Sequence, residues 1–141
     1  MSTSAALNRY KTVRASTSSP GELLNMLFDG IFKFLDEAIE ATDINDRARA
    51  GDRISRAHAI LTELAASLRK DAAPELCDNL EAVYFFCMTR LVEANIHRDA
   101  ARIREVERIL DPIRESFRLA SAEVAKSGLG VALSVVDGAR R

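Results

Sequence analysis

The sequence is poor in the residues that interrupt helices. Its 141 residues include three prolines and six glycines, and tryptophan is absent. Few helix breakers favour long, uninterrupted helices. Apolar runs are also short, and none approaches the roughly 20 residues that a membrane span requires, so we expect no membrane insertion. The first residues lack the apolar segment of a secretory signal, and we therefore expect a cytoplasmic protein.

Residues that carry out chemistry are scarce as well. Cys77 and Cys87 are ten residues apart on one predicted helix, which is about 15 Å of helix rise. That separation is too long for a disulfide and is not a metal-ligand spacing, so we expect buried, reduced thiols. The two histidines, His58 and His97, form no helical metal-binding pair, and no serine or cysteine lies in a nucleophile motif. We predict no catalytic residue, no metal site and no cofactor.

Charge of one sign is not in excess. Lysine and arginine (20) nearly balance aspartate and glutamate (21), so we expect no nucleic-acid partner. Four arginines crowd the first half of the second predicted helix, residues 46–68: Arg47, Arg49, Arg53 and Arg56. We interpret them as a solvated face paired to Asp46 and Asp52, with an acidic partner as the alternative.

Apolar residues recur at helical spacing through most of the chain. They predict helices over residues 19–41, 46–68, 74–96 and 99–124, joined by short polar turns. Four amphipathic helices with short connections predict an all-α fold, an antiparallel up-down-up-down four-helix bundle. We expect the bundle over residues 19–126, a mobile N-terminal arm over residues 1–18 and a short C-terminal tail over residues 127–141.

The first predicted helix has the clearest beginning. Ser19 is suited to cap it, Pro20 to occupy its first position, and Glu22 to complete a capping box with Ser19. The third predicted helix is apolar nearly all round, with one face that we assign to the core: Leu76, Leu80, Val83, Tyr84, Cys87, Met88, Leu91 and Ala94. In the last helix, Asp99 is the candidate cap, and Pro112 is expected to bend the helix.

Several large apolar residues lie off or at the edge of these core-facing positions. They are Met26, Ile60, Phe85, Val92, Ile109 and Leu119. One interpretation is that they line grooves for amphipathic segments of a partner. The other is that they pack against the arm and the tail. Periodicity alone leaves both open.

The order of several motifs resembles the flagellar secretion chaperones that escort flagellin. Residues 19–23 (SPGEL) and 26–30 (MLFDG) are similar to the start of that family's first long helix, and residues 54–64 (ISRAHAILTEL) to its second. The later helices add similar positions: Asn79, Leu80, Tyr84, Arg90, Leu91, Ala94 and Asn95, then Leu110, Arg114 and Phe117. The resemblance covers roughly residues 7–118. Phe28 and Phe117 depart from it, since Tyr and Trp are commoner there.

The resemblance implies a cytoplasmic chaperone of the flagellar type III export system. Such a protein binds the disordered C-terminal segment of flagellin, prevents premature polymerisation and presents the subunit to the flagellar export gate. The six apolar residues named above, which lie off or at the edge of the core-facing positions, would then form the flagellin-binding groove. Leu7 and Tyr10 occupy the places that the family associates with docking to the gate.

Two other classes of function stay open from the sequence. A histidine phosphotransfer domain is also a four-helix bundle and would use His58, although Leu61 and Thr62 stand where those domains usually have Lys and Gly. A purely structural dimerisation module would bury these six apolar residues within the chain or a homodimer. The pattern also leaves open whether the bundle is monomeric or weakly self-associating.

Overall fold

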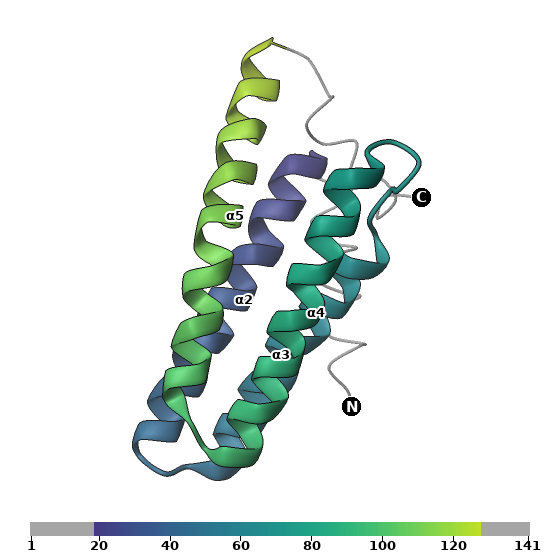
Figure 1. The fold of residues 1–141 in the computed structure, drawn as a ribbon. Coiled ribbons are helices and arrows are strands. Elements are labelled where there is room, and N and C mark those ends of the chain that lie inside the picture. Colours follow the sequence, from purple (N-terminus) through teal and green to yellow (C-terminus); the bar gives the residue numbers. More distant parts are fainter. Residues whose placement is uncertain (1–18, 128–141) are drawn as a thin grey trace.

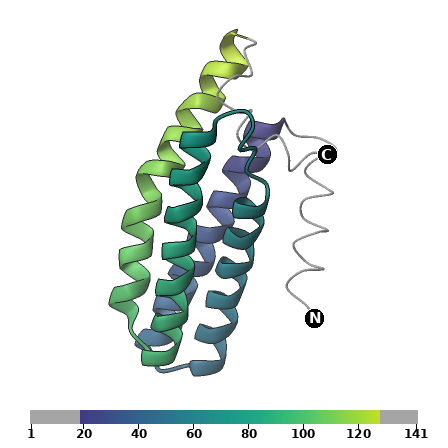
Figure 2. The same cartoon turned by 45° about the vertical axis from the view of Figure 1, so that its right-hand side comes forward.

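Four helices run along a common axis, each antiparallel to the one before it (Figures 1 and 2). A computed structural model describes residues 19–127, with the side chains of the last helix as far as residue 124. The helices are α2 (Pro20–Asp43), α3 (Arg47–Ala66), α4 (Pro74–His97) and α5 (Ala100–Ser127). No strand occurs among the residues described. The prediction of an all-α four-helix bundle is therefore confirmed.

The predicted capping box begins α2. The Glu22 backbone N–H donates to Ser19 Oγ at 3.1 Å, and the Ser19 backbone N–H donates to Glu22 Oε1 at 2.8 Å. Pro20 is the first helical residue, where its missing N–H costs nothing. A cap of this kind contributes about 1 kcal/mol, so the sequence itself fixes where the bundle starts.

The caps of the later helices follow the same chemistry. Asp46 accepts a hydrogen bond from the Arg49 backbone N–H at 3.1 Å and begins α3. Asp99 accepts one from the Ala101 backbone N–H at 2.9 Å, which confirms it as the cap of α5. α5 continues through Pro112, and its last turns extend beyond the ends of α2 and α4 (Figure 1).

The helices form a closed ring in which each packs against two neighbours. α2 contacts α3 and α5, and α4 contacts the same two helices from the opposite side. The wide apolar arc of α2 matches this arrangement, because it must face two helices at once. The largest fully buried side chains lie on all four helices: Tyr84, Phe28, Ile31, Leu35, Leu61, Leu64, Leu91, Ile103, Leu110, Val106, Cys77 and Cys87.

The core face of α4 differs at one position from the prediction. Leu76 is 46% exposed, whereas the neighbouring Cys77 is fully buried. The buried residues of α4 follow 3-4-3-4-3 spacing from Cys77 to Ala94, and Leu76 lies about 100° away from the first of them. Both cysteines are buried thiols, as predicted, and burial raises the pKa of Cys87 to about 12.

Candidate functional site

The outward face of α4 carries a stripe of exposed apolar side chains. Phe85, Val92 and Ile96, which we call the α4 stripe, are 49%, 47% and 67% exposed. Their spacing of seven and four residues places them within about 40° of one another around the helix. Three large apolar side chains left in water on one face of a helix make this face a candidate binding surface.

Phe85 is also the phenylalanine that the rest of the described chain leaves uncovered. Phe28 and Phe117 are buried. The other three rings each have a guanidinium over them, with Arg114 over Phe32 at 3.9 Å, Arg56 over Phe34 at 5.9 Å and Arg90 over Phe86 at 5.3 Å. Because a guanidinium shields an aromatic face from water while holding its own charge in solvent, these three rings are already partnered. Among the described residues, Phe85 has no such partner.

The predicted groove residues do not form one surface. Phe85 and Val92 share the α4 stripe, as two residues of one helix face. Leu119 is 60% exposed but lies on α5, apart from the stripe. Met26 and Ile109 are half-buried, and Ile109 packs against the core. Sequence reasoning missed Ile96, although its spacing of four residues from Val92 could have placed it on the same face.

Ile60 is not a surface residue, and its assignment to an exposed groove is wrong. It is 4% exposed and belongs to the core. A Cβ atom placed on Gly30 would lie 3.3 Å from Ile60 Cδ1. The missing side chain of Gly30 therefore leaves the space on α2 that Ile60 of α3 fills. The two residues predicted to dock to the export gate, Leu7 and Tyr10, lie outside the described residues.

A second apolar surface is a cleft between the start of α4 and the second half of α5. It has a volume of about 390 Å³ and is lined by Leu76, Leu80, Pro112, Ile113, Ser116, Phe117 and Ala120. The exposed Leu76 forms one of its walls. No single helix pattern signals this cleft, because it depends on how two helices are placed against each other.

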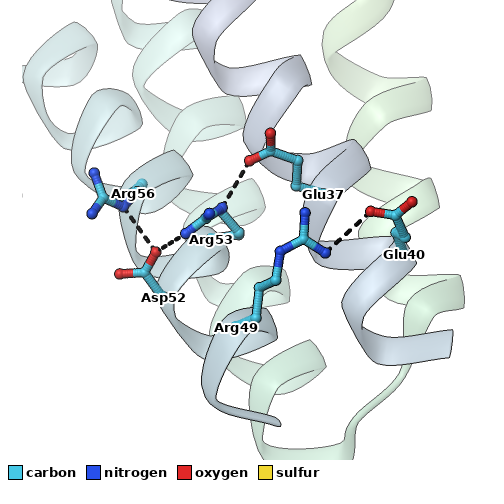
Figure 3. A network of polar contacts seen from close by, with 6 residues as sticks. All are labelled: Glu37, Glu40, Arg49, Asp52, Arg53 and Arg56. Carbon is cyan, nitrogen blue, oxygen red and sulfur yellow. Dashed lines mark hydrogen bonds and ion pairs between the residues drawn. The ribbon is translucent and has the colours of Figure 1, made fainter. Parts of the chain in front are cut away.

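The outer surface of α2 and α3 is charged instead (Figure 3). Its ion pairs join Arg49 to Glu40 at 3.1 Å, Arg53 to Glu37 at 2.8 Å and Arg56 to Asp52 at 2.9 Å. Asp52 also pairs with Arg53, and hydrogen bonds from these arginines lower the pKa of Asp52. Exposed pairs of this kind contribute about 0–1 kcal/mol each. Three of the four arginines thus form a solvated, paired face, as interpreted, although Arg49 pairs with Glu40 while Asp46 serves as a cap. Arg47 is the exception and has no ion pair among residues 19–127.

A carboxyl pair lies where α5 packs against α2. Glu107 Oε2 is buried and accepts no hydrogen bond from the described residues. Burial, a hydrogen bond to Asp36 and repulsion from that charge raise the pKa of Glu107 to about 8, against the opposing effect of Arg104 and Arg114. Since the folded protein binds this proton more tightly than the unfolded chain, the resulting stability is complete below pH 4.5 and is lost as pH rises through 8.

Glu107→Gln is expected to stabilise the bundle at pH 8 by an amount on the order of 1 kcal/mol and to change little at pH 5. Glutamine imitates the protonated acid, so the difference in the free energy of unfolding between the variant and the unchanged protein should grow as the pH rises from 5 to 8. Thermal unfolding followed by circular dichroism between pH 5 and 8 measures it. Glu115→Gln, on the same helix and paired to Arg118 at 2.6 Å, is the control and should show no such growth. Parallel pH curves for the unchanged protein and Glu107→Gln would contradict the assignment.

Nothing in the described chain suggests a catalytic centre. Residues 19–127 contain no group of three potential metal ligands, and none of their helices is long and apolar enough to cross a membrane. His58 is half-buried on α3, and Leu61, three residues further on, is fully buried. A phosphotransfer domain usually has a lysine at that place, so the structure offers this interpretation no support.

Comparison with known proteins gives one consistent result. The family model described as "Flagellar protein FliS" matches residues 3–124. A flagellar secretion chaperone FliS of Bacillus subtilis is 32% identical over 111 residues, 79% of this chain and 82% of the relative. The one from Salmonella typhimurium is 31% identical over 130 residues, 89% and 96% of the two chains. The one from Escherichia coli is 31% identical over 103 residues, 72% and 76%.

Proposed function

The chain belongs to the FliS family of flagellar proteins, and on that basis we propose that it is an export chaperone for flagellin. It binds the disordered C-terminal region of flagellin in the cytoplasm, prevents premature polymerisation and delivers the subunit to the flagellar type III export gate. Its relatives bear the name flagellar secretion chaperone. The observation that carries the proposal is the α4 stripe, an apolar surface with no other occupant among the described residues.

The geometry of the stripe suits a helical client segment. Along α4, Phe85 and Val92 are separated by about 10 Å and Val92 and Ile96 by about 6 Å. An amphipathic helix lying beside α4 presents apolar residues at the same intervals, because its own anchors repeat every three to four residues. The client can thus place one apolar side chain between each pair of stripe residues.

The stripe is too small to hold a disordered client alone. Its three side chains are between 47% and 67% exposed, so covering them contributes roughly 3 kcal/mol in total, taking about half the value of full burial for each. Folding a disordered segment on binding costs about 2–5 kcal/mol or more. A second apolar surface is therefore needed, and the α4–α5 cleft supplies one. A client that occupies both surfaces wraps around α4 in two pieces, with a net affinity low enough to permit release at the gate.

Delivery to the gate is assigned to the N-terminal arm. Leu7 and Tyr10 are the residues that we propose for docking there. Alanine substitution at both positions should leave flagellin binding intact and reduce export, which separates the two steps.

Titration calorimetry with a synthetic peptide of the C-terminal flagellin region from the same genome tests the proposal. We expect saturable 1:1 binding with a negative heat-capacity change, measured at two or more temperatures, since apolar area is buried. A peptide of the same composition in scrambled order is the control. If the native peptide gives no heat at any temperature and no change in fluorescence anisotropy, flagellin is not the client.

A further inference from the structure

A polar cavity lies at the end of the bundle toward which the α4 stripe runs. Its volume is about 230 Å³, and its walls come from the end of α2, the turn that follows it, the first half of α3 and the end of α4: Thr42, Asn45, Asp46, Arg47, Ala50, Ile54, Ala94, Asn95 and Arg98. Ile96, the last residue of the stripe, is a sequence neighbour of Asn95, so the stripe ends at the level of the cavity along α4.

Two arginines that have no ion pair among residues 19–127 line this cavity. Almost every arginine in residues 19–127 forms an ion pair with a carboxylate, and the exceptions in that range are Arg47, Arg98 and Arg108. Arg47 and Arg98 both belong to the cavity, whereas Arg108 lies on α5. Arg47 is the first residue of α3. Arg98 ends α4 in a left-handed conformation with φ 53°.

The other polar groups of the cavity leave a net positive charge. Asp46 is its one acid, and one carboxylate oxygen is engaged by the Arg49 backbone N–H. Asn45 and Asn95 can each donate through a side-chain amide. Two guanidinium groups and one carboxylate that is already engaged in capping α3 favour the binding of an anion. A carboxylate is suited to this site, because its two oxygens match the paired N–H donors of a planar guanidinium.

We propose that this cavity binds the terminal carboxylate of the client, an inference that rests on the proposed function. A C-terminal segment ends in a carboxylate that is ionised at neutral pH. With its apolar residues along the α4 stripe, such a segment has its end beside Arg98 and Arg47 when it runs in the same direction as α4. The cavity has several times the volume of one water, enough for the carboxylate and part of the last side chain. The client is thereby bound by its end and in one orientation.

The test compares two forms of the flagellin peptide, one with a free terminal carboxylate and one with a terminal amide. Calorimetry is expected to show that the amide binds the unchanged protein about tenfold more weakly, since a charge-assisted hydrogen-bonded pair is lost. Arg98→Gln and Arg47→Gln should each reduce the ratio of the affinities for the carboxylate and amide peptides. Arg98→Lys should keep part of that ratio, because lysine retains the positive charge. Arg108→Gln is the matched control, because Arg108 has no ion pair among residues 19–127 and does not line the cavity, and this variant should keep the full tenfold difference.

The outcomes separate the inference from the function on which it rests. Equal affinities of the two peptides for the unchanged protein would overturn the carboxylate site and leave the chaperone proposal standing. The carboxylate site would also be overturned if Arg98→Gln and Arg47→Gln weakened the binding of both peptides by the same factor. These arginines would then contact another part of the client. If neither peptide binds the unchanged protein, both proposals fail. Circular dichroism of each variant verifies that the bundle is folded.

Discussion

Replacing Phe28 by alanine is expected to lower the free energy of unfolding by about 3–5 kcal/mol. The ring is fully buried in the middle of α2, and its centroid lies 5.8 Å from that of Phe117 on α5. Alanine would leave a cavity between two helices that are held apart by other large side chains. Since a domain of this kind has a total stability of about 5–15 kcal/mol, the variant should be only marginally folded.

Urea denaturation followed by circular dichroism measures this loss. Phe34→Ala on the same helix is the control, because Phe34 is only partly buried and lies beneath Arg56. It should cost about 1 kcal/mol, within the usual range for single substitutions. An unchanged denaturation midpoint for Phe28→Ala would show that the ring does not support the core.

Phe28 and Phe117 are also the two positions at which the chain departs from the family pattern. At both positions the family more often has a residue with a polar group, and the sequence alone allows that group to meet a client. In the structure Phe28 is 0% and Phe117 8% exposed, and they face each other. A buried hydroxyl or indole N–H would need a partner inside the bundle. Phe28 therefore concerns the packing of α2 on α5, whereas Phe117 takes part in that packing and also lines the α4–α5 cleft.

Much of the fold could be predicted because each helix carries its own signals. The capping box at Ser19 and the cap at Asp99 depend on residues three or fewer positions apart, so tertiary structure need not be known. The core face of α4 cannot be read from its own pattern alone, since that helix is apolar nearly all round and a wide pattern accommodates Leu76 as readily as Cys77. The choice between them is made by α3 and α5, which the pattern of α4 does not contain.

The candidate site could be predicted only in part, for the same reason. Phe85 and Val92 were recognised because they lie off the core face of their own helix. Ile60 was misplaced because its burial depends on the absence of a side chain at Gly30, on another helix. The arginines that cover Phe32 and Phe34 also come from other helices. Exposure is thus a property of pairs of helices, whereas periodicity describes one helix at a time.

Phe85→Asp is expected to weaken binding of the flagellin C-terminal peptide by about thirtyfold or more, as for a central interface residue. The substitution removes the one exposed aromatic ring in residues 19–127 that no guanidinium covers and places a charge in the apolar surface. Because the side chain is already half exposed, the stability of the free protein should change by less than about 1 kcal/mol. Calorimetry measures the first effect and urea denaturation the second.

Phe86→Asp is the matched control for this change. Phe86 is the next residue of the same helix, is similarly exposed at 46%, and lies about 100° around α4. Both variants have the same change in charge, volume and helix propensity. Near Arg90, which lies over the Phe86 ring at 5.3 Å, the new carboxylate also has a cation within reach. Phe86→Asp should therefore keep an affinity within about twofold of the unchanged protein, well inside the effect expected at a binding residue.

The difference between the two variants decides whether binding depends on a specific face or on general hydrophobicity. A loss confined to Phe85→Asp places the client on the α4 stripe, because the neighbouring ring controls for the change in charge, volume and helix propensity. Equal losses would mean that added charge anywhere on α4 disturbs the client, and the stripe would not be the binding surface. Loss of folding in Phe85→Asp alone would show that Phe85 belongs to the core despite its exposure, and the α4–α5 cleft would then be the apolar surface that holds the client.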